Sequence, residues 1–158
     1  MSGPVPPEQQ EPLAEALKTS LLDVLETMAW SAVKLSREEQ HSNFMVRGEA
    51  CGVMRVHGAV TGLIGLATSQ YTGKELVSRI VGLSTDMLQP EDITDGLAEL
   101  ANLIGGGMKA KAGISGIHLD PPMAMVGQGI LAEWKTEAMT RVITFEVGRD
   151  QLRLYANF

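Results

Sequence analysis

The sequence is poor in cysteine, in aromatic residues and in positive charge. Cys51 is the single cysteine, so no disulfide can form within the chain, which is typical of a reducing compartment. Aromatic residues make up only 4% of the chain, so much of the core must come from Leu, Ile, Val, Ala and Met. The 9 Met residues either fill that core or line an adaptable binding surface, and the sequence leaves both interpretations open.

Positive charge is scarce relative to negative charge. Lys and Arg number 13 against 19 Asp and Glu, which gives a net charge of −6. Binding to nucleic acid depends on clustered positive charge, so DNA and RNA are excluded as the main partners. The acidic balance suits a basic protein partner, or simply solubility.

Long apolar runs are also missing. No stretch approaches the ~18–20 residues that cross a bilayer, and the N-terminal sequence MSGPVPPEQQEP has neither the basic nor the apolar segment of a secretory signal. We therefore expect a cytoplasmic protein that does not bind membranes. The 158 residues suffice for one domain without a metal or disulfide. We expect residues 1–11 to form a disordered N-terminal lead and residues 12–158 to form that domain.

Hydrophobic periodicity predicts helices that alternate with strand-rich stretches. Pro90, Glu91 and Asp92 are typical of a helix N-terminus, and His57-Gly58 is typical of a hairpin turn. The predicted segments are helices at 12–35, 71–81 and 90–112, a hairpin within 44–68, and strands at 123–126, 134–145 and 151–158. Hairpins with helices between them predict an α+β fold, a mostly antiparallel sheet with helices packed on it.

The helix predicted at 90–112 carries the one group of polar side chains that indicates chemistry. At 100° per residue, Asp95, Asn102, Gly106 and Lys109 all fall within about 80° of Glu99. The opposite side of this helix is apolar and contains Leu97, Leu100, Ile104 and Met108. The ordinary interpretation of such a polar stripe is a solvated helix face.

Three consecutive glycines, Gly105-Gly106-Gly107, favour a functional interpretation of the stripe. Each glycine costs ~1 kcal/mol relative to alanine inside a helix, so stability alone does not explain them. Gly106 lies on the stripe beside Glu99 and Asn102, where a bare backbone would let a partner approach closely. The same glycines predict a kink or loosening of the helix that would displace Lys109.

The stretch from Glu99 to Lys109, ELANLIGGGMK, resembles the E-x-x-N-x-x-x-G-x-x-K signature of the CheC/CheX/FliY chemotaxis phosphatases. The earlier segment GAVTGLIGLATSQYTGKELVSRIVGL is similar to the hairpin and helix of that family. The signature appears once, as in the CheX branch, whereas CheC carries two sites. The resemblance covers roughly residues 12–158 and implies a CheC/CheX-like fold.

What the resemblance implies is a protein phosphatase that accelerates hydrolysis of the aspartyl phosphate on a CheY-type response regulator. By the family pattern, Asn102 would orient the attacking water and Glu99 would pair with an active-site lysine of the regulator. Gly106 would give clearance to the partner, and Lys109 would belong to the interface or the fold rather than to the chemistry. Asp95 matches no residue of the family pattern, but it lies on the same stripe and is expected, with Gly106 and Lys109, to contact the partner. The phosphorylated regulator would carry Mg²⁺, so we expect no cofactor of the chain's own, and the family implies a homodimer. The alternative is a non-catalytic binding or scaffold domain of the same fold that recognises a signalling or flagellar partner.

Other candidate motifs are weaker. The segment Thr72–Glu75 lacks the first glycine and the final Ser or Thr of a phosphate-binding loop. His41, His57 and His118 lack the spacing of metal ligands, so no metal site is predicted and we expect surface or packed histidines. Cys51 lies in a predicted strand and is expected to be a small buried apolar residue.

Overall fold

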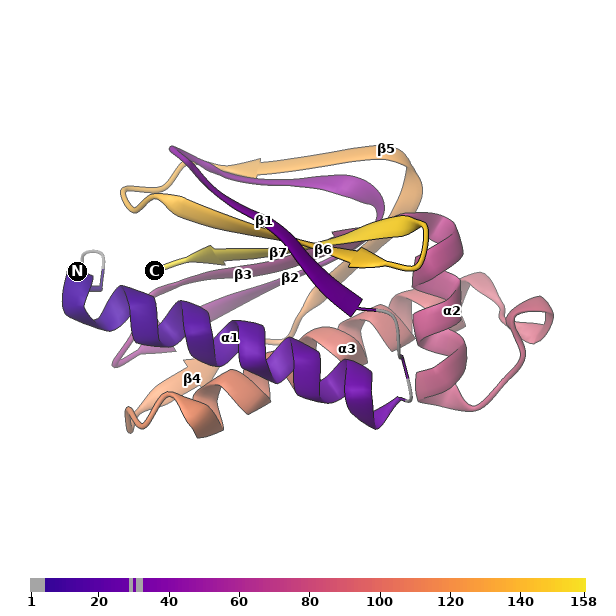
Figure 1. Ribbon diagram of the computed structural model, residues 1–158, viewed down its shortest axis with the longest axis horizontal. Coiled ribbons are helices and arrows are strands. Elements are labelled where there is room, and N and C mark those ends of the chain that lie inside the picture. Colours follow the sequence, from indigo (N-terminus) through magenta and orange to yellow (C-terminus); the bar gives the residue numbers. More distant parts are fainter. Residues whose placement is uncertain (1–4, 29, 31–32) are drawn as a thin grey trace.

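The computed structural model describes residues 5–28, 30 and 33–158. The helices in this part of the chain are α1 (Pro7–Thr27), α2 (Gln70–Val81), the short 3₁₀ helix η1 (Thr85–Met87) and α3 (Pro90–Lys111). The strands are β1 (Val33–His41), β2 (Phe44–Gly58), β3 (Gly62–Thr68), β4 (Ile117–Leu119), β5 (Met123–Trp134), β6 (Thr140–Val147) and β7 (Asp150–Asn157). The α-helices pack on one side of an antiparallel sheet (Figure 1), which confirms the predicted α+β fold. None of the described helices is long and apolar enough to cross a membrane.

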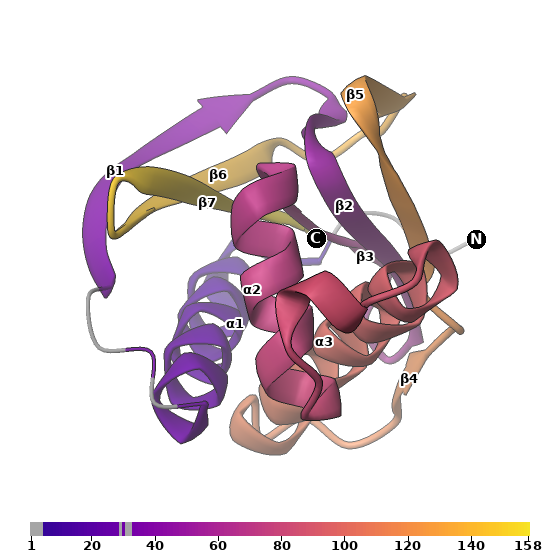
Figure 2. The same ribbon diagram turned by 90° about the vertical axis from the view of Figure 1, so that its right-hand side faces the viewer.

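The sheet has the strand order β1-β6-β7-β3-β2-β4, and β5 pairs with β2. All of these pairings are antiparallel. A register shift between Gly48 and Ala50 marks an irregularity in β2, and such bulges bend a strand. Figure 2 shows β1 and the start of β2 curving over β6 and β7 on the side away from the helices. The sheet therefore has an inner face under the helices and an outer face that its own strands partly cover.

Each face of the sheet has an apolar core. The main core lies between the helices and the inner face, and its members include Leu13, Leu17, Leu21, Leu100, Ile104, Met108, Phe145, Leu152 and Leu154. A smaller cluster on the outer face contains Phe44, Val46, Cys51, Val53, Ala67, Val142 and Tyr155. Successive side chains of a strand point to opposite faces, so β2 contributes Val56 to the first core and Val53 to the second. Methionines occur both in the interior and on the surface: Met54 and Met108 are buried, whereas Met87 is 60% exposed.

The N-terminal helix differs from the prediction at both ends. α1 begins at Pro7 rather than at residue 12, because proline is well suited to the first turn of a helix. Residues 7–11 of the predicted disordered lead are therefore helical, and residues 1–4 lie outside the described residues. At its other end the helix stops at Thr27, and the chain from 33 to 41 forms β1. Because nearly all of β1 is exposed, its pairing with β6 leaves no apolar pattern in the sequence.

The C-terminal strands also differ from the prediction in their boundaries. The segment 134–145 is not one strand: β5 extends from Met123 to Trp134, and β6 begins only at Thr140. The three-residue strand β4 was not predicted, since only its pairing with His57 and its neighbours in β2 defines it. The predicted hairpin, the two later helices and the last strand are confirmed to within a few residues.

The buried thiol of Cys51 generates a prediction about reactivity. Burial raises the pKa of Cys51 from its ordinary value of 9.0 to about 11, so the reactive thiolate is scarce near neutral pH. We expect the native protein to react with a thiol reagent such as DTNB at least about 100-fold more slowly than the urea-unfolded chain, since two pKa units reduce the thiolate about 100-fold. Equal rates in both states would show that Cys51 is accessible.

Candidate functional site

α3 is held by a capped N-terminus and a buried apolar face. Pro90 lies in its first turn, and Gln89 and Asp92 form a capping box in which Asp92 accepts a hydrogen bond from the Gln89 backbone N–H (2.9 Å). The predicted apolar residues Leu97, Leu100, Ile104 and Met108 are each at most 1% exposed. The predicted apolar side of the helix is thus the side that packs on the core.

Two of the three consecutive glycines allow α3 to pack closely against its neighbours. A Cβ at Gly105 would lie 3.0 Å from Sδ of Met54 on β2, and a Cβ at Gly107 would overlap the hydroxyl of Ser20 on α1. That hydroxyl donates a hydrogen bond to the Ile104 carbonyl oxygen (2.7 Å). These glycines therefore have a packing function: a Cβ at Gly107 would displace Ser20 of α1, and one at Gly105 would crowd the ends of the Met54 and Leu119 side chains.

The middle glycine has no such packing function. A Cβ at Gly106 would meet nothing within 4 Å, and the residue is exposed. The helix continues through all three glycines to Lys111, so the predicted kink is absent and Lys109 remains in the helix. Gly106 is thus a bare stretch of helix surface that packing within the chain does not require.

The predicted polar stripe is exposed to solvent. Asp95, Glu99, Asn102, Gly106 and Lys109 all lie on the solvent side of α3. None of the four side chains in this set forms a hydrogen bond or ion pair with another described residue. Polar side chains on one helix face that are not engaged within the chain remain available to another molecule.

Glu99 and Asn102 are the two members of the stripe with complementary chemistry. Residues three apart on a helix are neighbours, with Cβ atoms about 5–6 Å apart. A carboxylate accepts hydrogen bonds and attracts a cation, while a carboxamide both donates and accepts without changing its charge.

The sequence analysis did not include Leu103 in the stripe. This side chain is 42% exposed and lies at about 40° from Glu99 at the helical step. Its position on the helical wheel was the signal that could have placed it on the same exposed face.

No metal centre is evident among the described residues. They contain no group of three or more His, Cys, Asp or Glu side chains arranged to hold an ion. His57 instead pairs with Asp120 (Nε2 to Oδ1, 2.9 Å) and stacks on His118, with ring centroids 5.4 Å apart. His41 is exposed and lies 3.2 Å from a Glu39 carboxylate oxygen.

The segment Thr72–Glu75 belongs to α2 and is not a phosphate-binding loop. Ser69 caps this helix by accepting a hydrogen bond from the Thr72 backbone N–H (3.1 Å). Asp150 accepts hydrogen bonds from the hydroxyls of both Ser69 and Thr72. Burial acts to raise the pKa of Asp150, but these hydrogen bonds outweigh it and lower the pKa. The Asp150 carboxylate therefore occupies the N-terminal end of α2, which is the end of a helix that attracts phosphate.

The fold and the site together define a class of protein. It is an α+β domain with a carboxylate, an amide and a bare backbone on one exposed stripe of a helix. The sequence from 50 to 146 matches the model of the family described as chemotaxis phosphatase CheX, which covers more than half of the chain and includes all of α3. The chain belongs to the CheX family.

Solved structures of low sequence identity share this fold. A chemotaxis protein CheX from Desulfovibrio desulfuricans is 20% identical with a TM-score of 0.79, and the match covers 91% of this chain and 97% of that chain. CheX from Vibrio vulnificus is 22% identical with a TM-score of 0.78, over 92% of this chain and 97% of that chain. A CheX–CheY–BeF3–Mg²⁺ complex from Borrelia burgdorferi is 15% identical with a TM-score of 0.70, and the match covers 91% of this chain and 96% of that chain. A search of curated proteins finds no significant match.

The different surroundings of the glycines generate a prediction about stability. Gly106→Ala should raise the free energy of unfolding by up to about 1 kcal/mol, because alanine favours the helix and meets no neighbour. Gly107→Ala should lower it by about 1–3 kcal/mol, because the new methyl group displaces Ser20. Urea unfolding of both variants measures the difference. Equal stability of the two variants would contradict the close contact between α1 and α3.

Proposed function

We propose that this protein accelerates hydrolysis of the aspartyl phosphate on a CheY-type response regulator. The observation that carries the proposal is the exposed pair Glu99 and Asn102, which no described residue engages, on a helix that lies within the range matched by the family model. The CheX–CheY complex of Borrelia burgdorferi supports the choice of partner, since it joins a protein of this fold to a regulator.

Asn102 is the residue that we assign to the chemistry. Hydrolysis of an acyl phosphate needs a water placed in line with the bond that breaks and compensation of charge on the phosphoryl oxygens. A carboxamide orients a water through hydrogen bonds without having to be a strong base. Asn102 projects from a rigid helix, which suits insertion into the partner's site.

The remaining stripe residues position the partner. Glu99 meets a lysine of the regulator's active site and so holds α3 in register with the phosphorylated aspartate. Gly106 gives clearance for the partner's backbone, because no side chain projects there. Asp95 and Lys109 contact the regulator at the rim of the interface, where single charges affect the association rate more than the affinity.

The chain needs no cofactor of its own in this proposal. The regulator holds the Mg²⁺ next to its aspartyl phosphate, and Asn102 acts on the water alone. We place the reaction in the cytoplasm, in keeping with the single reduced and buried cysteine.

A homodimer is a further part of the proposal, and β5 is the strand that supports it. β5 has 12 residues and pairs only with β2 among the described strands, so its other edge is free. An unpaired edge of this length is a template for pairing with another chain. The exposed side chain of Leu131, 54% accessible, adds apolar surface to this strand.

Substitution of the paired residues tests the catalytic proposal. The wild-type protein should accelerate decay of a phosphorylated CheY-type regulator in the presence of Mg²⁺. Asn102→Ala should lose about 10²–10³-fold of this acceleration, the typical cost of removing one positioned group. Glu99→Ala should mainly weaken binding, with a higher KM. Glu26→Ala, which removes an exposed glutamate from α1, is the matched control and should behave as wild type.

The outcomes separate the function from the site. If Asn102→Ala is as fast as wild type, the site assignment is wrong although the activity stands. If the wild-type protein binds its cognate regulator but leaves the decay rate unchanged, the phosphatase proposal is wrong and the protein is a non-catalytic binding domain. Circular dichroism of each variant confirms that the helix content is unchanged.

Sedimentation of two matched variants tests the dimer. We expect wild type to sediment as a dimer and Leu131→Lys, on β5, to shift toward the monomer because a charge at the edge opposes pairing. Met139→Lys, at a residue 53% exposed outside the strands, should remain dimeric. A monomeric wild type, or dimers of both variants, would contradict pairing through β5.

A further inference from the structure

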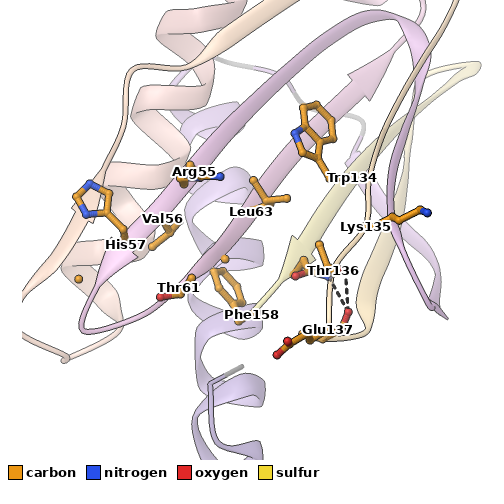
Figure 3. A pocket seen from close by; sticks show the side chains of 14 residues that line it. Arg55, Val56, His57, Thr61, Leu63, Trp134, Lys135, Thr136, Glu137 and Phe158 are labelled. Carbon is orange, nitrogen blue, oxygen red and sulfur yellow. Dashed lines mark hydrogen bonds between the residues drawn. The ribbon is translucent and has the colours of Figure 1, made fainter. Parts of the chain in front are cut away.

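A pocket of about 510 Å³ lies on the outer face of the sheet, away from α3 (Figure 3). Its floor comes from β2, β3 and the end of β7, and its wall is the end of β5 with the connection to β6. The volume lies within the ~300–1,000 Å³ typical of small-molecule sites. The phosphatase proposal does not use this pocket.

The wall of the pocket is held rigidly in place by one buried side chain. Asn157 is 3% exposed, and its amide nitrogen lies within hydrogen-bond distance of Thr136 Oγ1 (3.0 Å), the Ala138 carbonyl oxygen (2.9 Å) and Thr140 Oγ1 (2.9 Å). Two of these contacts lie on the connection between β5 and β6. The pocket is therefore formed before any ligand binds, which reduces the entropy lost on binding.

The lining of the pocket combines an apolar surface with the cationic side chains of Arg55 and Lys135 and the carboxylate of Glu137. Leu63 and Trp134 are half-buried and line it, and Trp134 is fixed by an edge-on contact with Phe44, with ring centroids 5.5 Å apart. Arg55 lies directly opposite Leu63 in the β2–β3 pairing, so both side chains are on the outer face.

The charge of Arg55 is not balanced within the described chain. Its guanidinium forms no ion pair or side-chain hydrogen bond with another described residue, whereas the neighbouring His57 pairs with Asp120. Figure 3 shows the Lys135 side chain pointing away from the other labelled residues. A planar guanidinium next to apolar surface suits a carboxylate, sulfonate or phosphate with an apolar body.

We propose that this pocket binds a small organic anion whose flat apolar body packs against Trp134 and Leu63 and whose charged group pairs with Arg55. The site lies on the opposite face of the sheet from the Glu99–Asn102 stripe, so binding and phosphatase activity can be measured separately. The ligand proposed for the pocket is a small molecule, whereas the ligand proposed for the stripe is a protein.

The fluorescent anion 1-anilinonaphthalene-8-sulfonate is the probe, because it joins an aromatic body to a sulfonate. We expect saturable binding of one molecule per chain, with energy transfer from Trp134. Arg55→Gln should weaken binding about tenfold, the effect of losing one charge-assisted hydrogen bond. Arg149→Gln removes an exposed arginine that does not line the pocket and should leave binding unchanged. Trp134→Phe should remove most of the energy transfer, whereas Trp30→Phe should preserve most of it.

Two results would overturn the proposal. Equal affinities of Arg55→Gln and Arg149→Gln would show that Arg55 does not bind the anion. Loss of transfer in Trp30→Phe but not in Trp134→Phe would place the probe elsewhere on the molecule. Because no regulator is present in this titration, its failure would not affect the phosphatase proposal.

Discussion

The close packing of α3 is the constraint on which the proposed site depends. Gly96 lies against Val77 of α2, where a Cβ would be 2.5 Å from Cγ1, and Gly105 and Gly107 lie against β2 and α1. Close contacts of these glycines with three neighbouring elements leave α3 little freedom to rotate about its axis. Glu99 and Asn102 lie on the side of the helix that faces solvent. Packing thus determines which stripe of the helix is exposed.

The curvature of the sheet shapes the face of the molecule opposite the helices. The start of β2 and the end of β5 pair with each other beyond the bulge at Gly48 and Ala50. The side chains of this part cover the outer face and form the smaller core. The same arrangement leaves a pocket between Arg55 and the end of β5. One face of the sheet supports the helix that carries the proposed partner-binding stripe, and the other carries the pocket in which we propose that a small anion binds.

Local signals in the sequence predicted the elements that carry a buried periodic pattern. α3 is one example, because its apolar residues recur at helical spacing and its N-terminus has Pro90 and a capping box. The elements that the sequence did not predict share a cause. β1 is almost entirely exposed and β4 has three residues, so both exist through pairing with β6 and β2, far away in the chain. The boundary between β5 and β6 likewise depends on the hydrogen bonds of Asn157 to the connection.

The sequence by itself determined the α+β class, the polar stripe of α3 and the family resemblance, because each is written in spacing along one element. Only the tertiary structure decided what the three consecutive glycines do. Gly105 and Gly107 make room for Met54 and Ser20, which lie 51 and 87 positions away, whereas Gly106 faces open space. Three identical residues differ in role because a helix turns each of them toward a different neighbour, and those neighbours come together only in the fold.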